Sequence, residues 1–217
     1  MLLRRFLILF FFVNYSAFAQ TDHTHADSAD KETRILILGD SLSAGYGLKQ
    51  EQAWVQLLQN AYNKEQLPIT LINASISGET SGGVLQRLPA LLAEYTPEWV
   101  LVEIGGNDGL RGYPIKHLKQ NLMQIVGKSK DSGAEVLLME VEITPNLGKR
   151  YATMFTNTYQ QVAKAHQINT IPFFIRSVAT EANLMLPDGI HPNAIAQPQL
   201  AEIMKQHFDE ALAEKAE

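Results

Sequence analysis

Ser41 and His191 stand in two loops that could combine into a nucleophilic pair. Ser41 lies in the segment GDSLSAGYG (39–47), and His191 lies in the segment PDGIHPN (187–193). Asp188 precedes the histidine by three residues, a spacing that lets a tight turn point the carboxylate and the imidazole the same way. The carboxylate would fix the ring tautomer and leave the other ring nitrogen to accept the Ser41 proton. These residue types predict nucleophilic catalysis by Ser41, His191 and Asp188.

Two glycine-rich loops between these segments could supply hydrogen-bond donors. The loop NASISGETSGG (73–83) contains Gly78, whose backbone N–H could face a developing oxyanion. The loop GGNDG (105–109) contains Asn107, whose side-chain amide is a donor with no proton to lose. Together these groups could surround the carbonyl that Ser41 attacks.

Each of the four loops also has a purely structural interpretation. A Gly-Asp-Ser turn, a Ser- or Thr-capped helix start and a surface histidine before a helix use the same residue types without chemistry. The residues alone leave these interpretations open. We expect Asp40 and Asp108 to brace their own turns through backbone hydrogen bonds.

The elements that must position these loops alternate along the chain. Short, nearly continuous apolar runs are typical of parallel strands buried on both faces, and the stretches between them have helical periodicity. The predicted strands are 34–38, 69–72, 99–104, 135–139 and 170–174, and the predicted helices are 53–64, 83–94, 115–131, 151–166 and 194–215.

This alternation predicts an α/β fold, a three-layer α/β/α sandwich with right-handed crossovers. We expect a flavodoxin-like, five-stranded parallel sheet with the order 2-1-3-4-5. In such a sheet, ligands bind beyond the carboxyl ends of the strands, where the strand order reverses. Ser41 and Asn107, which follow the first and third strands, should therefore face one cleft.

The first nineteen residues have the form of a secretory signal peptide. Two arginines precede the apolar run 6–13, which is too short to span a bilayer, and the small-residue pattern AFA (17–19) follows. The polar segment 20–33 is expected to be a flexible leader, and residues 34–217 are expected to form a single domain. We therefore expect a periplasmic or secreted protein, cleaved near Ala19, without a stable membrane anchor.

Composition excludes several classes. The formal net charge is −5, and it becomes −7 without the two arginines of the signal segment, which argues against nucleic acid as a partner. The absence of cysteine removes a thiol nucleophile, a thiolate metal site and the cysteine of a lipoprotein anchor. His23 and His25 form an H-x-H pair, but a solvated tail is the expected state of that segment.

Taken together, the four loops resemble the four sequence blocks of the SGNH or GDSL hydrolase family, which is named after its Ser, Gly, Asn and His. The matching residues are Ser41, Gly78, Asn107 and His191, in the family's order and spacing. The stretches that carry the resemblance are ILGDSLSAGY (37–46), NASISGETS (73–81), LPALL (88–92), WVLVEIGGNDGLRG (99–112) and DGIHPNAIAQP (188–198).

The resemblance implies the SGNH hydrolase fold and a triad of Ser41, His191 and Asp188. It also implies an oxyanion hole made of the backbone N–H groups of Ser41 and Gly78 and the side chain of Asn107. The implied reaction is hydrolysis of acyl esters through an acyl-enzyme. No metal and no organic cofactor are expected.

Substrate preference is not implied, because two segments depart from the family's pattern. These are Gly82-Gly83 and ITPN (143–146), which we expect in loops at the edge of the acyl cleft. The apolar side chains that we expect to line the cleft, each of which also suits ordinary packing, are Leu42, Ile76, Leu110, Tyr113, Pro145 and Ile190.

Export favours lipid esters outside the cytoplasm over coenzyme A esters inside it. We therefore expect a monomeric serine esterase that acts on small-molecule acyl esters, including lysophospholipids, acyl thioesters and simple carboxylic esters. A carbohydrate O-deacetylase of the same family is the alternative enzyme. A non-catalytic module that holds an anion or nucleotide is the alternative from another class, although the chain lacks a G-x-G-x-x-G run and a P-loop lysine pattern.

Overall fold

Five parallel strands form one sheet in the computed structural model, which describes residues 32–143 and 147–216. The order across the sheet is β2-β1-β3-β4-β5, as the sequence predicts. The strands are β1 (Thr33–Gly39), β2 (Ile69–Asn73), β3 (Trp99–Glu103), β4 (Glu135–Met139) and β5 (Thr170–Ile171). The predicted signal peptide and all but the end of the predicted leader lie outside the described residues.

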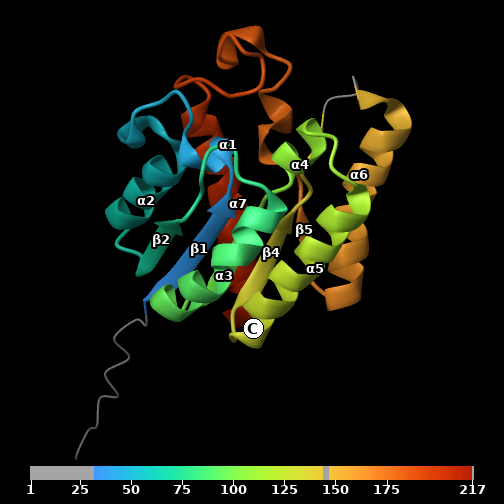
Figure 1. Ribbon diagram of the computed structural model, residues 1–217. Coiled ribbons are helices and arrows are strands. Elements are labelled where there is room, and N and C mark those ends of the chain that lie inside the picture. Colours follow the sequence, from blue (N-terminus) through green and yellow to red (C-terminus); the bar gives the residue numbers. More distant parts are fainter. Residues whose placement is uncertain (1–31, 144–146, 217) are drawn as a thin grey trace, which may run out of the picture.

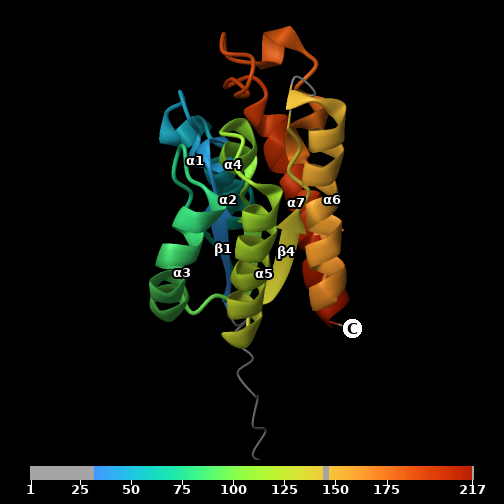
Figure 2. The ribbon, with the colours of Figure 1, turned by 45° about the vertical axis from the view of Figure 1, so that its right-hand side comes forward.

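Helices cover both faces of the sheet and complete the predicted three-layer sandwich. Figures 1 and 2 show helices on both sides of the sheet. The first layer contains α2 (Trp54–Lys64) and α7 (Gln197–Ala216), which pack together. The second layer contains α3 (Ser81–Tyr95), α5 (Ile115–Asp131) and α6 (Lys149–His166), with α5 packed against both others.

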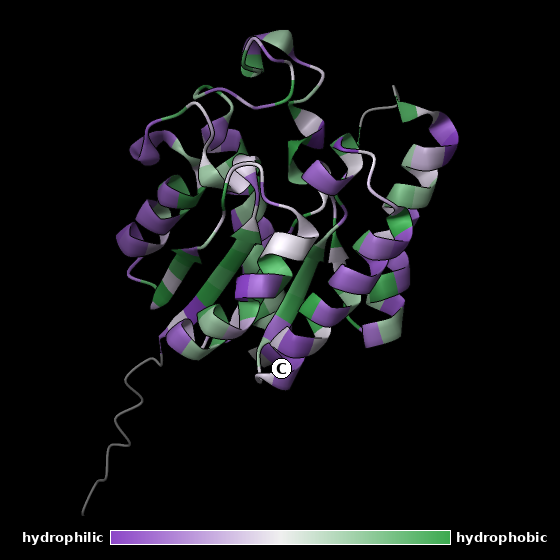
Figure 3. Ribbon diagram, viewed as in Figure 1, coloured by the Kyte–Doolittle hydropathy of each residue, from purple (hydrophilic) through white to green (hydrophobic). Residues whose placement is uncertain are grey.

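The core lies between the sheet and these helices. The central residues 35–38 of β1 and 100–102 of β3 are at most 1% exposed, because helices cover both faces of these strands. On α2, Trp54, Leu58 and Tyr62 repeat every four residues and are buried, as the helical periodicity predicts. Figure 3 shows the hydrophobic strands enclosed by helices whose outer surfaces are more hydrophilic.

The last strand is shorter than the sequence predicts. The apolar run 170–174 was expected to be a strand, but β5 ends at Ile171. Pro172 follows, and it cannot donate a hydrogen bond to the sheet. The chain then turns into the 3-10 helix η3 (Phe174–Ser177), so this part of the prediction is wrong.

Several short helices were not predicted as separate elements, and two of them follow the strands that carry the candidate site. These are α1 (Ser41–Ala44) after β1 and α4 (Gly106–Leu110) after β3; besides η3, η1 (Gln50–Gln52) and η4 (Ala182–Leu184) are further examples. Gly39 of β1 pairs in register with Glu103 of β3, so both strands end at the same edge of the sheet. Figures 1 and 2 show α1 and α4 close together beyond that edge.

Within the residues that the structure describes, every helix is too short or too polar to cross a bilayer.

Candidate active site

Ser41 is the first residue of α1, directly beyond the end of β1. The side chain of Asp40 caps this helix, because its Oδ1 accepts a hydrogen bond of 3.1 Å from the backbone N–H of Leu42. The predicted bracing role of Asp40 is therefore confirmed. The backbone N–H of Ser41 has no hydrogen-bond acceptor within the described part of the chain, so it remains free to bind a ligand oxygen.

Asp188 and His191 lie in a tight loop before α7. An isolated bridge joins Met185 to Pro192, and the backbone N–H of Leu186 donates to the carbonyl of His191 at 2.7 Å. Asp188 Oδ1 accepts from the backbone N–H groups of Ile190 and His191 at 2.8 and 3.0 Å. The predicted three-residue spacing thus produces a closed turn in which both side chains point the same way.

These two side chains form a hydrogen-bonded row with Ser41. Asp188 Oδ2 lies 2.8 Å from His191 Nδ1, and His191 Nε2 lies 2.8 Å from Ser41 Oγ. Desolvation raises the pKa of Asp188, but hydrogen bonds from the His191 backbone and ring and from the Ile190 backbone outweigh it and lower that pKa to about 2. The carboxylate is therefore ionised at neutral pH, and the imidazole can transfer a proton from the hydroxyl.

Tyr46 also contacts this row, although no sequence motif pointed to it. Its ring centroid lies 4.5 Å from that of His191, with the ring planes tilted by 38°. The tyrosine follows α1 within the same glycine-rich segment as Ser41. A packed aromatic ring restricts how far the imidazole can rotate, so Tyr46 helps to fix its orientation.

Asn107 in α4 is held beside Ser41 by Asp40. Its Nδ2 donates to Asp40 Oδ2 at 3.2 Å, which leaves its second amide hydrogen free to bind a substrate oxygen. The preceding Gly105 has φ of 123°, and a Cβ there would lie 2.3 Å from the hydroxyl of Tyr159. Only glycine fits this position, so the chain can turn sharply out of β3 and bring Asn107 to the site.

Gly78 lies in the loop after β2 and borders the same cavity as Ser41 and Asn107. Its φ of 81° is in the left-handed region, and its carbonyl accepts a hydrogen bond of 2.8 Å from Arg111 Nη2. No acceptor for the Gly78 N–H occurs among the residues that the structure describes. The loop thus offers a second free backbone donor to the cavity.

A buried hydrogen bond ties this loop to α4. Asp108 accepts from the backbone N–H and the hydroxyl of Ser81, at 2.8 and 2.5 Å, and both residues are buried. The expectation that Asp108 braces its own turn is therefore wrong, because both of its carboxylate oxygens accept from Ser81 at the start of α3. Gly82 and Gly83, expected in a loop at the cleft edge, lie in the first turn of α3 and not on the cavity wall.

Glu103, the last residue of β3, places a second buried carboxyl group beneath Ser41. It is fully buried; its Oε2 accepts from Ser43 Oγ at 2.7 Å and from the Asp40 N–H at 3.4 Å. Burial, followed by the charge of Asp40, raises the pKa of Glu103 well above its ordinary value. Burial also raises the pKa of Asp40, although the Leu42 N–H and the nearby imidazole of His191 act against that rise. A lone acidic residue in an apolar run was the sequence signal for Glu103.

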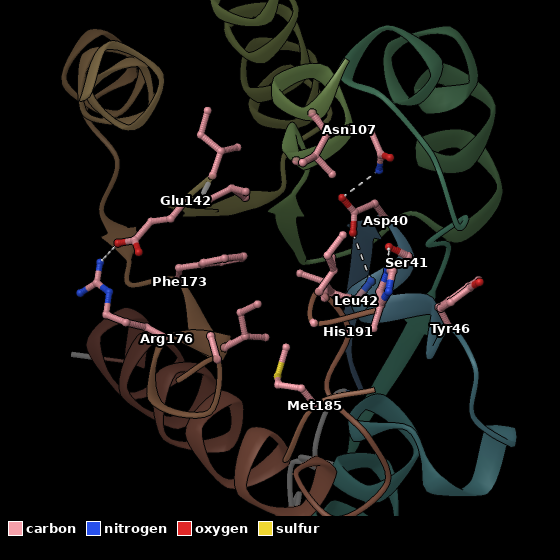
Figure 4. Close-up of a pocket in the computed structure, with 18 of the residues that line it drawn as sticks. Asp40, Ser41, Leu42, Tyr46, Asn107, Glu142, Phe173, Arg176, Met185 and His191 are labelled. Atoms are coloured by element: carbon pink, nitrogen blue, oxygen red, sulfur yellow. Dashed lines mark hydrogen bonds and ion pairs between the residues drawn. The ribbon is translucent and has the colours of Figure 1, made fainter. Parts of the chain in front are cut away.

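A cavity of about 710 Å³ opens beside these groups (Figure 4). Three of the six predicted cleft residues line it, namely Leu42, Leu110 and Ile190. Ile76 and Tyr113 do not, so these two predictions are wrong; their side chains are exposed outside the cavity. Pro145 lies outside the described residues. Ile143, which lies in a segment expected at the cleft edge, also lines the cavity. The apolar lining residues that the sequence did not indicate are Val141, Phe173, Ile175, Ala179 and Met185.

These additional residues lie near the carboxyl ends of β4 and β5 and in the segments that follow. Ligands bind at the carboxyl edge of a parallel sheet, and β4 and β5 end at that edge. Of the segment ITPN (143–146), which was expected at the cleft edge, Ile143 lines the cavity and the other three residues lie outside the described part of the chain. In the part of the chain that the structure describes, no three acidic or histidine side chains gather into a set of metal ligands.

Known proteins are similar to this chain in sequence and in fold. The model of the GDSL-like Lipase/Acylhydrolase family matches residues 37–197. An arylesterase of Vibrio mimicus is 46% identical over 175 residues, 81% of this chain and 88% of the relative. The thioesterase 1/protease 1/lysophospholipase L1 of Escherichia coli (strain K12) is 47% identical over 174 residues, 80% of this chain and 82% of the relative.

A solved structure extends the likeness to three dimensions. The psychrotrophic esterase EstA from Pseudoalteromonas sp., solved in a form inhibited by monoethylphosphonate, has a TM-score of 0.82 and 49% identity. The match covers 83% of this chain and 99% of that chain. The range matched by the family model includes Ser41, Gly78, Asn107 and His191, which border the cavity. The chain therefore belongs to the GDSL-like lipase/acylhydrolase family and is an ester hydrolase.

Proposed function

We propose that this protein is an exported serine hydrolase that cleaves acyl esters through an acyl-enzyme, with Ser41 as nucleophile. The observation that carries the proposal is the unbroken row from Asp188 Oδ2 to His191 Nδ1 and from His191 Nε2 to Ser41 Oγ, with both contacts at 2.8 Å. A hydroxyl becomes a useful nucleophile when a base lies within hydrogen-bond reach and a third group orients that base. Both conditions hold here.

In the proposed mechanism, Ser41 Oγ attacks the ester carbonyl carbon while His191 Nε2 takes the hydroxyl proton. Asp188 stabilises the imidazolium that forms. The imidazolium then gives the proton to the leaving alcohol or thiol, and the acyl group stays on Ser41. Water attacks this ester with His191 as the base, and the acid leaves as the serine hydroxyl is restored.

The negative charge that develops on the carbonyl oxygen must be stabilised by hydrogen-bond donors. We assign this role to the backbone N–H groups of Ser41 and Gly78 and to the side chain of Asn107. The two free backbone donors and the anchored amide that border one cavity support the assignment. Donors fixed before the reaction stabilise the transition state because they need no reorganisation.

The substrate class follows from the cavity wall. Its apolar side chains favour an acyl chain over a polar sugar. The names of the relatives, an arylesterase and a thioesterase/lysophospholipase, support small acyl esters, thioesters and lysophospholipids as substrates. The proposed chemistry uses no metal and no organic cofactor.

We also propose that the protein acts as a monomer in the periplasm or outside the cell. The signal-like segment 1–19 and the expected leader 20–33 support export. Amino-terminal sequencing of protein recovered from the periplasm tests cleavage near Ala19, and sedimentation of the mature chain tests the monomer.

A substrate panel tests the proposed activity. Lysophosphatidylcholine, p-nitrophenyl butyrate and butyryl-coenzyme A should all be hydrolysed by the wild-type chain and not by Ser41→Ala. Acetylated xylose should be a poor substrate, because its polar ring would meet an apolar wall. Rapid deacetylation of the sugar, with slow hydrolysis of the acyl esters, would reject the proposed substrate class in favour of a carbohydrate O-deacetylase.

A further inference from the structure

The cavity beside Ser41 has two chemically different ends. Asn107 and His191 border it near Ser41, and an ion pair between Glu142 and Arg176 lies on the opposite side. Arg176 Nη2 donates to Glu142 Oε1, and Figure 4 shows Phe173 between this pair and the triad. No step of the proposed mechanism uses these two charges.

The pair joins the chain segments that leave the last two strands of the sheet. Glu142 follows the end of β4 by three residues, and Arg176 lies in η3, beyond β5. Their side chains are 37% and 56% exposed. Both charges therefore keep part of their hydration while they border the cavity.

Most of the remaining cavity wall is apolar. It includes Leu110, Val141, Ile143, Phe173, Ile175 and Ile190. Each methylene that leaves water for such a wall raises affinity by about fourfold. An acyl chain attached to Ser41 should therefore gain in kcat/KM with each carbon that reaches this wall.

That gain ends where the chain meets the ion pair. A methylene placed there would displace water from two charges without replacing the lost hydrogen bonds. We infer that the Glu142–Arg176 ion pair is the specificity-determining end of the acyl site and sets an upper limit on acyl-chain length. This inference rests on the proposed function and adds a length preference to it.

An anionic group is a less suitable occupant of this end. The guanidinium of Arg176 is already engaged by the carboxylate of Glu142. A phosphate that approached Arg176 would also approach that carboxylate, and like charges repel. The apolar wall that leads to the pair likewise suits a hydrocarbon chain.

The test measures kcat/KM for p-nitrophenyl esters from acetate to palmitate, each below its micelle concentration. In the wild-type chain, kcat/KM should rise with length, reach a maximum and fall. In the double variant Glu142→Leu/Arg176→Leu, the maximum should move by two or more carbons towards longer chains. The ratio of kcat/KM for dodecanoate to that for butyrate should rise about tenfold or more, because two further methylenes meet an apolar wall.

Two further variants make the test specific to charge at this position. The charge swap Glu142→Arg/Arg176→Glu restores an ion pair and should keep the wild-type ratio. Glu135→Leu/Lys215→Leu removes a comparably exposed ion pair, 3.4 Å long, between β4 and α7, away from the cavity, and should also keep it. A ratio unchanged within twofold in the active double-leucine variant would overturn the inference, as would a swap variant that behaves like the leucine variant.

A role of Arg176 in binding an anionic leaving group would give a different result. If Arg176→Leu slowed butyryl-coenzyme A but left the p-nitrophenyl series unchanged, the residue would belong to an anion-binding leaving-group site, and the length limit would be rejected. Failure of the proposed function looks different. A wild-type chain that hydrolyses no ester in the series refutes both proposals, whereas an unchanged ratio in an active variant refutes only the length limit.

Discussion

Two carboxyl groups stand close to the Ser41–His191 pair, and their surroundings differ sharply. The side chain of Asp188 is 36% exposed and accepts three hydrogen bonds from its own turn and from the imidazole. Asp40 is buried, packs near a second buried carboxyl group, Glu103, and anchors Asn107. The pKa of Asp188 is lowered to about 2, whereas burial raises the pKa of both other carboxyl groups.

This difference assigns the carboxyl groups to different tasks. An ionised carboxylate against the imidazole can stabilise positive charge as it develops. Burial disfavours the charged form of the other two carboxyl groups and makes them less suited to that task, but their fixed hydrogen bonds can hold a turn and an amide in place. We therefore expect Asp188 to contribute electrostatically to catalysis. Asp40 and Glu103, the buried carboxyl groups that hydrogen-bond to α1, should contribute by holding other groups in position.

The same substitution at the two aspartates should separate these tasks most clearly. Asp188→Asn removes the charge from the imidazole and should lower kcat by about 10⁴-fold. Asp40→Asn keeps an acceptor for the Leu42 N–H but places an amide against Asn107, and it should lower kcat by about tenfold, the effect of one misplaced hydrogen bond. Steady-state kinetics with p-nitrophenyl butyrate measure both, and equal losses would contradict the division of tasks.

Removal of the anchored amide should have the next largest effect. Asn107→Ala should lower kcat by about 10²- to 10³-fold with little change in KM, because the amide acts mainly on the transition state. Asn121→Ala is a matched control, because Asn121 donates to Ser81 Oγ and does not border the cavity. A loss confined to KM in Asn107→Ala would remove this side chain from the oxyanion site.

The burial of Glu103 should affect the free energy of unfolding and its pH dependence. The folded state binds the Glu103 proton more tightly than the unfolded state, so this group favours folding below its ordinary pKa. That contribution is lost as pH rises towards the raised pKa. Glu103→Gln has no such loss. The free energy of unfolding of this variant, relative to that of the wild type, should therefore be higher at pH 8 than at pH 5. Urea denaturation measures the difference, and a constant gap at both pH values would contradict it.

Asp188 should respond to pH in the opposite sense. Because folding lowers its pKa from 3.8 to about 2, its contribution to stability is present above the ordinary pKa and is lost as pH falls through about 2. Asp188→Asn lacks this contribution at every pH, so its deficit in the free energy of unfolding relative to the wild type should shrink as pH falls from about 5 towards about 2. Urea denaturation across this pH range measures the deficit, and a deficit that stayed constant would contradict the prediction.

The smallest effect should come from the ring that packs on His191. Tyr46→Ala should lower kcat/KM by about two- to tenfold, the range expected from the loss of one aromatic contact. Tyr46→Phe keeps the ring and should match the wild type within experimental error. If Tyr46→Phe lost as much activity as Tyr46→Ala, the hydroxyl and not the stacking would be responsible.

The sequence predicted the strands and the glycine-rich loops because both follow from local patterns, whereas the expected sheet order came from the common flavodoxin-like topology. Apolar runs marked the strands, and glycine-rich segments at their carboxyl ends marked the loops with Ser41, Gly78 and Asn107. It did not predict the early end of β5, where one residue, Pro172, overrode an apolar run. It also gave the wrong side-chain directions for Ile76 and Tyr113, because loop residues lack the periodicity that reports which way a side chain points.

The role of Glu103 shows a different limit of sequence reasoning. The acidic residue was visible at the end of an apolar run, but its partner Ser43 lies 60 positions away. Contacts of that kind depend on the register between β1 and β3, which an apolar pattern alone does not determine. The Glu142–Arg176 pair, formed across 34 positions by segments beyond two neighbouring strands, was hidden for the same reason.

Stoichiometric labelling with a fluorophosphonate measures the central claim, activation of the Ser41 hydroxyl by His191, without choosing a substrate. Peptide mapping of the wild-type chain should find one label per molecule, on Ser41, and Ser41→Ala should remain unlabelled. His191→Ala should react at least 100-fold more slowly, as expected when a serine loses its general base. A label on another serine, or the same labelling rate in His191→Ala as in the wild type, would contradict the account.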